Sequence, residues 1–314
     1  MYNFFKTSWL VLLAGSVFYL RPVALERYND KKNLLVNLDT SGLIAPGDTL
    51  HLLSRKFAFT EGPAVDEQGN IFFTDQPNNN IWKWATDGSL LLFLHGTGRS
   101  NGLYIDKAGN IIACADAKNE VWRITPNKKK TILYKASKRK RLNGPNDVWV
   151  DAGGGIYLTD PYYQRPYWKR KHPVLKGQYV YYLAPGKKQL VTIDTTLKQP
   201  NGIVGTPDGK QLFISDIGDS KIYKYDIAAA GVLQNKTLFA EQLCDGLTLD
   251  DQGNVYTAGN GVTIFNKDGK KIEHISVPEK WTSNVCLGGS ERNQLFITAS
   301  EAVYTIKMQA KGVE

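Results

Sequence analysis

The sequence predicts an all-β fold, a single six-bladed β-propeller of four-stranded antiparallel blades closed by an N-terminal strand. The main observation is a repeat that runs through most of the chain. Six short apolar segments each begin with an oxygen-bearing residue; these opening residues are Glu61, Asn101, Asn146, Asn201, Asp245 and Asn284. They are separated by 40, 45, 55, 44 and 39 positions. Repeats of about 40 to 50 residues are typical of propeller blades.

Each opening residue is expected to begin the first strand of a blade. In five of the repeats a glycine-containing turn follows, and second strands are predicted at 71–74, 111–115, 156–159, 212–215, 255–258 and 295–299. Four of these strands run directly into an aspartate: Asp75, Asp116, Asp160 and Asp216. Aromatic-rich third strands are predicted at 81–84, 121–124, 179–183, 222–225, 262–265 and 303–306. Short β-rich runs between Gly, Asn and Asp residues favour antiparallel sheets over helices.

The fourth strands indicate how the ring closes. They are expected at 90–94, 131–134, 190–193, 237–239 and 272–277, each shortly before the next opening residue. Only eight residues follow Ile306, too few and too polar for another good strand, whereas 50–53 precedes Glu61 in the same relation. We therefore expect this N-terminal strand to complete the last blade, which removes an open sheet edge.

Composition excludes several other classes of protein. The 314 residues are 42% hydrophobic and 22% charged, which excludes disorder, collagen and coiled coil. The net charge of +9 lies partly in short basic runs at 128–130, 138–141 and 169–171. No nucleic-acid recognition motif accompanies them, so solvated turns are the favoured interpretation and no nucleic-acid partner is expected. The three cysteines show neither a disulfide framework nor zinc-ligand spacing.

The N-terminus reads as a targeting segment. Residues 9–20 form a run without charge, which suits the core of a signal peptide better than a membrane span of about 20 residues. The cleavage site is ambiguous, so an uncleaved anchor or a buried element are the alternatives. We expect a signal peptide or anchor at 1–24, a lead-in segment at 25–48 and the propeller at 49–314, with the protein outside the cytoplasm, periplasmic or secreted. No membrane association is expected beyond that anchor.

The opening residues suggest a metal site. The first strands of a propeller line its axis, so these six side chains are expected to face one another. Two carboxylates and several amide oxygens are ligands that calcium prefers. The alternative is that Asn and Asp only shape the turns before the strands, which explains Glu61 poorly.

Five motifs resemble the senescence marker protein (regucalcin)/gluconolactonase family of six-bladed propellers. They are Thr60-Glu-Gly-Pro63, Arg141-Leu-Asn-Gly-Pro-Asn-Asp147, Pro200-Asn-Gly202, Asp245-Gly246 and Thr282-Ser-Asn-Val-Cys-Leu-Gly-Gly289. The resemblance covers about residues 57–300. It implies a divalent metal in the axial channel, with the ligands Glu61, Asn146, Asn201 and Asp245. Substrate contacts are expected from Asn101, Arg141, Asn284 and Asp160. Cys244 departs from the family pattern, which often has proline there.

The resemblance implies a metal-dependent lactonase that opens a small-molecule lactone, with a sugar lactone such as gluconolactone as the expected substrate. The cation polarises the carbonyl, and Asp245 is the candidate general base, with Glu61 the second candidate. Calcium is favoured, with zinc, magnesium and manganese as alternatives. A phosphotriester hydrolase similar to diisopropyl-fluorophosphatase, or a non-enzymatic ligand-binding propeller with a structural calcium, are the other interpretations.

The 55-residue spacing indicates an insertion at 161–176, rich in aromatic and basic residues. Loops of this length are often functional. We expect either a lid, in which Arg165, Lys169 or Arg170 attracts an acidic group, or a basic surface loop. Serine-hydrolase chemistry is excluded because Gly-x-Ser-x-Gly is absent.

Overall fold

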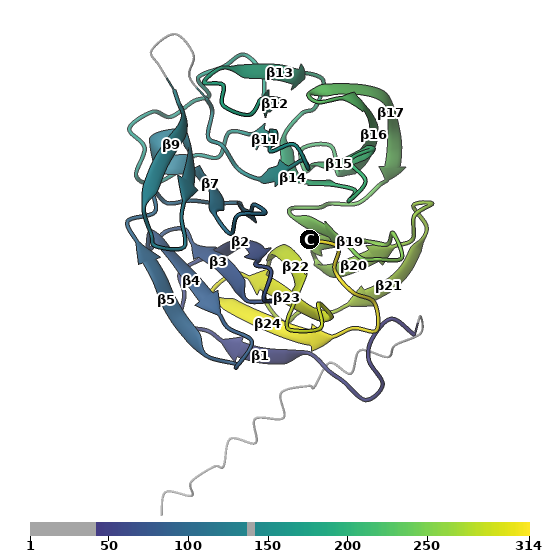
Figure 1. The fold of residues 1–314 in the computed structure, drawn as a ribbon. Coiled ribbons are helices and arrows are strands. Elements are labelled where there is room, and N and C mark those ends of the chain that lie inside the picture. Colours follow the sequence, from purple (N-terminus) through teal and green to yellow (C-terminus); the bar gives the residue numbers. More distant parts are fainter. Residues whose placement is uncertain (1–41, 137–141) are drawn as a thin grey trace, which may run out of the picture. The chain divides into compact units, whose positions relative to one another are not determined.

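Six four-stranded antiparallel sheets form a ring in the computed structural model, which describes residues 42–136 and 142–314 (Figure 1). Blade 1 contains β2 (Thr60–Val65), β3 (Ile71–Asp75), β4 (Asn80–Trp84) and β5 (Leu90–His95). Blade 2 contains β6 (Leu103–Ile105), β7 (Ile111–Ala115), β8 (Glu120–Ile124) and β9 (Lys130–Lys135), with the short 3₁₀ helix η1 (Asp116–Lys118) after β7. Blade 3 contains β10 (Val148–Val150), β11 (Ile156–Asp160), β12 (Tyr179–Leu183) and β13 (Leu190–Asp194).

The other three blades follow the same plan. Blade 4 contains β14 (Pro200–Gly205), β15 (Gln211–Asp216), β16 (Lys221–Ala229) and β17 (Val232–Ala240). Blade 5 contains β18 (Leu247–Leu249), β19 (Val255–Gly259), β20 (Gly261–Phe265) and β21 (Lys271–Ile275). Blade 6 contains β22 (Thr282–Gly288), β23 (Gln294–Ala299), β24 (Ala302–Lys307) and β1 (His51–Ser54). The predicted six-bladed all-β fold is confirmed.

The ring closes between the two ends of the described chain. β1 pairs antiparallel with β24, with His51 opposite Thr305 and Leu52 opposite Tyr304. The predicted N-terminal closure is therefore confirmed. Just before β1, Leu43 and Ile44 are buried against the core of blade 6. The predicted signal peptide or anchor at 1–24 lies outside the described residues, and within the described ranges no helix is long and apolar enough to cross a membrane.

Strand register defines the two ends of the ring. In blade 1, Thr60 lies opposite Asp75, and Val65 lies opposite Ile71. The opening residues therefore share one end of the ring, which we call the site face, with the loops that leave each second strand. The turns between first and second strands lie at the other end; there, Asp66 accepts hydrogen bonds from the backbone and side chain of Asn70. The insertion after Asp160 consequently emerges on the site face.

The core consists of apolar layers between neighbouring sheets. Trp149 and Tyr157 of blade 3 pack in one buried cluster with Phe213 and Tyr225 of blade 4. Phe73 of blade 1 likewise packs against Phe296 of blade 6, with ring centroids 5.2 Å apart. Each fully buried apolar side chain contributes about 1.5 to 3 kcal/mol. This packing fixes the blades that carry the opening residues.

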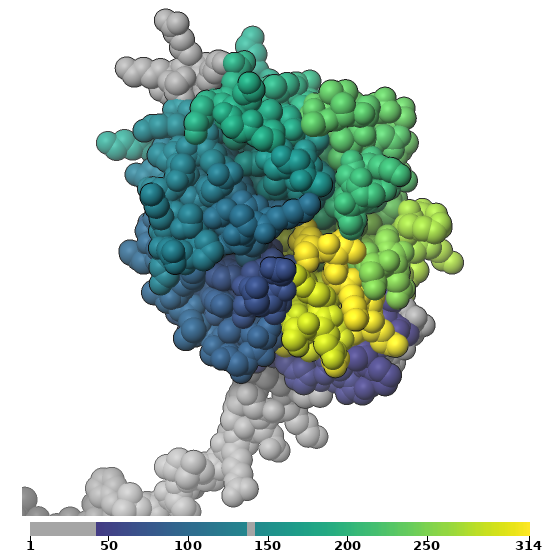
Figure 2. Space-filling view, in the orientation of Figure 1, coloured from purple at the N-terminus to yellow at the C-terminus, as the bar shows by residue number. Residues whose placement is uncertain are grey.

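The C-terminal residues cover the middle of the ring at the end opposite the site face. Gly312 forms a bridge with Asp250, its N–H donates to the carbonyl of Arg292, and Val313 packs against the core. Figures 1 and 2 show this yellow segment reaching the centre of the ring, where the chain ends in the picture. As predicted, no further strand of a blade follows β24.

Candidate metal centre and active site

Hydrogen bonds link each blade to the opening segment of the next around the whole axis. Four of the donors lie in opening segments, and the other two, Thr74 and Thr159, lie in second strands. The acceptor is the carbonyl of an opening residue or of the residue before it. The six contacts run from Thr74 Oγ1 to Asn101 (3.0 Å), Gly102 N to Asn146 (2.7 Å), Thr159 Oγ1 to Asn201 (2.6 Å), Gly202 N to Asp245 (2.8 Å), Gly246 N to Ser283 (2.9 Å) and Ser283 Oγ to Thr60 (2.6 Å). These contacts hold the backbone of the opening segments in one closed ring around the axis.

The glycine after an opening residue allows this close approach. A Cβ on Gly102 would lie 2.3 Å from Oδ1 of Asp147, and one on Gly246 would lie 2.0 Å from the side chain of Asn284. Real Cβ atoms do not make such contacts. The repeated Asn-Gly and Asp-Gly pairs are thus explained by blade-to-blade packing at the axis.

Glu61 and Asp245 form a buried acidic pair within the ring. They are only 4% and 6% exposed, and neither has a basic side chain within 4.0 Å among the described residues. Burial and the nearby charge of Asp245 hold the pKa of Glu61 well above its ordinary value. Burial also raises the pKa of Asp245 to about 6, although hydrogen bonds from Trp281 and Asn201 oppose the shift.

These residues fit a hard divalent cation. Two buried carboxylates without an ion pair leave negative charge that such a cation would neutralise. The Asn146 side chain is buried and makes no hydrogen bond to any other described residue, so its oxygen is available as a ligand. No group of three or more His, Cys, Asp and Glu residues in the described ranges is arranged to hold a metal, so a cation at this ring would also need amide oxygens. Glu61, Asn146, Asn201 and Asp245 together offer an all-oxygen set of the kind calcium takes.

The other predicted site residues fall into three places. Asn101 and Asn284 lie in the ring beside the four candidate ligands, and Oδ1 of Asn284 accepts the N–H of Val285 at 2.8 Å. Asp160 lies outside the ring, where its carboxylate accepts the N–H groups of Asn143 (2.9 Å) and Gly144 (2.7 Å). It thereby supports the segment that carries Asn146. Arg141 lies outside the described residues.

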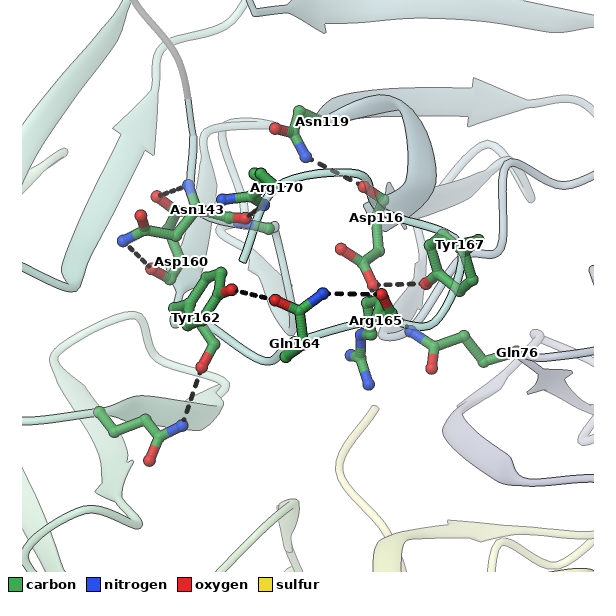
Figure 3. A network of polar contacts seen from close by, with 12 residues as sticks. Gln76, Asp116, Asn119, Asn143, Asp160, Tyr162, Gln164, Arg165, Tyr167 and Arg170 are labelled. Carbon is green, nitrogen blue, oxygen red and sulfur yellow. Dashed lines mark hydrogen bonds and ion pairs between the residues drawn. The ribbon is translucent and has the colours of Figure 1, made fainter. Parts of the chain in front are cut away.

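The insertion after β11 packs over the site face. Asn201 Nδ2 donates to the hydroxyl of Tyr163 at 2.8 Å, so the loop contacts a candidate metal ligand. Oδ2 of Asp116, in blade 2, accepts from Arg165 Nε (2.8 Å), Tyr167 Oη (2.9 Å) and Gln76 Nε2 (3.1 Å), as Figure 3 shows. The loop of blade 3 is therefore fastened to blades 2 and 4, and Gln76 of blade 1 shares the Asp116 acceptor. This arrangement favours the lid interpretation over a basic surface loop.

Three residues with clear contacts to the site were not assigned a role from the sequence. Asp116 anchors the lid, Tyr163 contacts Asn201, and Trp281 Nε1 donates to Asp245 Oδ2 at 2.6 Å. Trp281 directly precedes the last motif, which begins at Thr282, so its place in the sequence already indicated that it lies near the opening residues. The other two depend on how the loop folds across the ring, which sequence spacing does not specify.

Comparison with known proteins agrees with this geometry. Residues 59–301 match the family model described as the SMP-30/Gluconolactonase/LRE-like region. The chain belongs to this family. The family resemblance in the opening motifs is therefore confirmed, and the matched range contains all six opening residues.

Individual relatives of the family extend the comparison. A gluconolactonase from Zymomonas mobilis is 28% identical over 296 residues, which cover 84% of this chain and 82% of the relative. The solved structure of a gluconolactonase from Xanthomonas campestris superposes with a TM-score of 0.79 at 26% identity, covering 87% of this chain and 93% of that one. The diisopropyl-fluorophosphatase of Loligo vulgaris is 25% identical over 286 residues, covering 80% of this chain and 90% of the relative.

Proposed function

We propose that this protein is a divalent-metal-dependent hydrolase that opens a lactone ring, with a sugar lactone of the gluconolactone type as substrate. The observation that carries the proposal is the buried pair Glu61 and Asp245, which lies in a closed ring of oxygen-bearing residues without a basic partner within 4.0 Å among the described residues. The similarity to gluconolactonases supports the choice of substrate.

Glu61, Asn146, Asn201 and Asp245 would hold the cation. Calcium is favoured over zinc because every donor is oxygen, and over magnesium because the set includes neutral amide oxygens, which calcium takes readily while magnesium usually keeps several waters. Manganese remains an alternative. When bound, the cation would polarise the lactone carbonyl as a Lewis acid. Tyr163 holds the amide of Asn201 through its hydroxyl, and Trp281 fixes one oxygen of the Asp245 carboxylate. These contacts orient the donors before substrate arrives.

Hydrolysis also needs a group that takes a proton from the attacking water. We assign this role to the Asp245 carboxylate, with Glu61 as the second candidate. In the metal-free protein, burial raises the pKa of both groups and favours their protonated forms. A bound cation would favour the ionised form, which is the form that can accept a proton. The lid over the site face would limit the access of bulk water during the reaction.

Phosphotriester hydrolysis is the second candidate function. It is favoured by the similarity to the squid diisopropyl-fluorophosphatase, which covers 80% of this chain. A non-enzymatic propeller with a structural calcium would use the same donors, and turnover distinguishes it from both hydrolases.

The deciding experiment measures hydrolysis of a panel of aldonolactones and of diisopropyl fluorophosphate, before and after removal of metal with a chelator. We expect lactone turnover that is lost with chelator and restored by a divalent cation. Re-addition of calcium, zinc, magnesium and manganese separately would rank the metals. Turnover of the phosphotriester alone would favour the second function, and no turnover of either would favour the binding protein.

We also propose export from the cytoplasm, to the periplasm or the medium, which the uncharged run at 9–20 supports. Fractionation of cells that express the full chain, with mass spectrometry of the N-terminus, would test it. Intact protein in the cytoplasmic fraction would contradict the proposal.

A further inference from the structure

A cavity of about 670 Å³ lies on the site face between the lid and blades 1 and 2. The lid contributes residues 164–167, blade 1 and its flanking loop contribute Phe59 and Gln76, and Arg99 enters from the connection between β5 and β6. Two arginines, Arg99 and Arg165, line the cavity, and none of its lining residues is acidic. An anionic ligand would therefore meet two guanidinium groups without meeting a carboxylate.

Arg165 is fixed from behind by a buried carboxylate. Its Nε donates to Asp116 at 2.8 Å, and its side chain is only 18% exposed. The Nη atoms make no hydrogen bond to any other described residue, and in Figure 3 the guanidinium end points away from the polar network around Asp116. A guanidinium held at Nε presents its two Nη groups as a fork, which matches carboxylate and phosphate oxygens.

Arg99 is held by the same network from the other side. Its guanidinium carbon lies 4.5 Å from the centre of the Tyr167 ring, and the hydroxyl of Tyr167 donates to Asp116. Its backbone has a φ of 52°, the left-handed region that residues other than glycine seldom adopt, and its N–H donates to Oδ1 of Asn79 at 2.7 Å. Unfavourable backbone conformations persist where the surroundings enforce them, often at ligand sites.

The cavity adjoins the candidate metal centre. Phe59, which lines it, precedes Glu61 by two residues, and the charge of Arg165 acts on both Glu61 and Asp245. A substrate with its reacting carbonyl at the ring of opening residues would extend its remote end toward Arg165. One net positive charge remains after Asp116 is counted against the two arginines, which suits an anionic substituent.

We propose that the cavity lined by Arg99 and Arg165 is an anion-binding subsite for a carboxylate or phosphate group that the lactone carries away from its carbonyl. The inference rests on the proposed lactonase function and narrows its substrates to lactones of acidic or phosphorylated sugars. Arg165 is the specificity-determining residue, and Asp116 is the positioning residue that aims it.

The first test compares kcat/KM for gluconolactone, gluconolactone 6-phosphate and a monolactone of glucaric acid. The wild-type protein is expected to favour at least one anionic lactone over the neutral one. In Arg165→Gln the ratio of anionic to neutral kcat/KM should fall by about tenfold or more, the scale of a charge-assisted hydrogen bond. The phosphate and carboxylate arms show which anion the subsite takes.

Two further variants separate charge recognition from other effects. Arg123→Gln also removes one positive charge, but from an exposed residue paired with Asp106 at 3.8 Å on the far side of blade 2 from the lid, and it should leave the ratio unchanged. Arg165→Lys keeps the charge and should retain more of the preference than Arg165→Gln. No preference in the wild-type protein, or an equal ratio in all four proteins, would overturn the proposal.

A binding measurement separates this inference from the lactonase proposal itself. Titration calorimetry with sodium sulfate on the metal-loaded protein should show binding that Arg165→Gln weakens and Arg123→Gln preserves. If no lactone is hydrolysed but sulfate binding depends on Arg165, the proposed function fails and the subsite stands. If lactones are hydrolysed and neither sulfate binding nor the substrate ratio depends on Arg165, the subsite is refuted alone.

Discussion

The indole Nε1 of Trp281 donates a hydrogen bond of 2.6 Å to Oδ2 of Asp245. Trp281 lies just before β22 of blade 6, whereas Asp245 opens blade 5. The last blade therefore orients the carboxylate of its neighbour. This contact also lowers the pKa of Asp245, against the larger opposing effect of burial.

Replacement of Trp281 by Phe should weaken the site without removing any candidate ligand. Loss of the donor leaves Asp245 with a higher pKa, so protons compete with the cation up to higher pH. We expect cation affinity to fall by about tenfold near neutral pH, the scale of one hydrogen bond to a charged group. We also expect the loss of cation affinity on acidification to begin at a higher pH than in the wild type. Calorimetric titration with calcium at several pH values measures both effects. An unchanged pH profile would show that Trp281 serves packing alone.

Glu61→Gln should stabilise the metal-free protein and destabilise the metal-loaded one. Burial raises the folded-state pKa of Glu61 above its ordinary value of 4.5, so the folded state binds more protons than the unfolded state. Metal-free wild-type protein then loses stability as pH rises from about 4.5 through the folded-state pKa. The amide cannot ionise, so the variant escapes this loss.

At pH 8 with chelator, we expect the free energy of unfolding of the Glu61→Gln variant to be about 2 kcal/mol higher than that of the wild type, because the variant lacks an uncompensated buried charge. With saturating calcium the order should reverse. Urea unfolding followed by circular dichroism measures both. Glu67→Gln, on the exposed turn of the same blade, is the control and should follow the wild type. A less stable Glu61→Gln protein in chelator would argue against the charged pair.

Gly102→Ala should damage the ring of opening residues. The new Cβ would lie 2.3 Å from Asp147 Oδ1 and 2.7 Å from the carbonyl of Asn146, so one segment must move. We expect a loss of about 1 to 3 kcal/mol in unfolding free energy, typical of overpacking, together with weaker cation binding. Gly88→Ala is the matched control, since its φ of 85° strains the backbone while its Cβ meets nothing within 4 Å. Equal cation affinity in both variants would separate Gly102 from the metal site.

Asp116→Ala should release the lid. Arg165, Tyr167 and Gln76 all lose their shared acceptor. We expect faster tryptic cleavage after Lys169 or Arg170 in the loop, and an increase of about tenfold in KM, because substrate binding must then order the loop. Mass spectrometry of the cleavage products measures the first effect and steady-state kinetics the second. Asp208→Ala, in a solvated turn of blade 4, should change neither.

Much of the fold was predictable because each blade repeats the same local pattern. The spacing of the opening residues located every first strand, and the unpaired strand before Glu61 predicted the contact between β1 and β24. The convergence of these residues followed from the topology alone, because equivalent positions in a propeller face one axis. The identities of the proposed cation and of the substrate are not encoded in such a repeat.

The contacts of the lid could not be predicted from the repeat pattern of the sequence. Asp75, Asp116, Asp160 and Asp216 occupy the same position at or just after a second strand. Three of them accept backbone N–H groups from the segment before the blade, as Asp75 does from Ala58. Asp116 instead accepts hydrogen bonds from side chains of the lid and of blade 1. That difference depends on a loop 45 or more residues away, so no local signal distinguishes it.

The pairing of β1 with β24 has a consequence for synthesis on the ribosome. β1 is translated before every blade, yet its partner strand is about 250 residues further along the chain. Until that partner appears, β1 has unpaired backbone groups, a state open to mispairing with other chains. Cellular yield should therefore respond to chaperone supply and translation speed more than to the stability of any single blade.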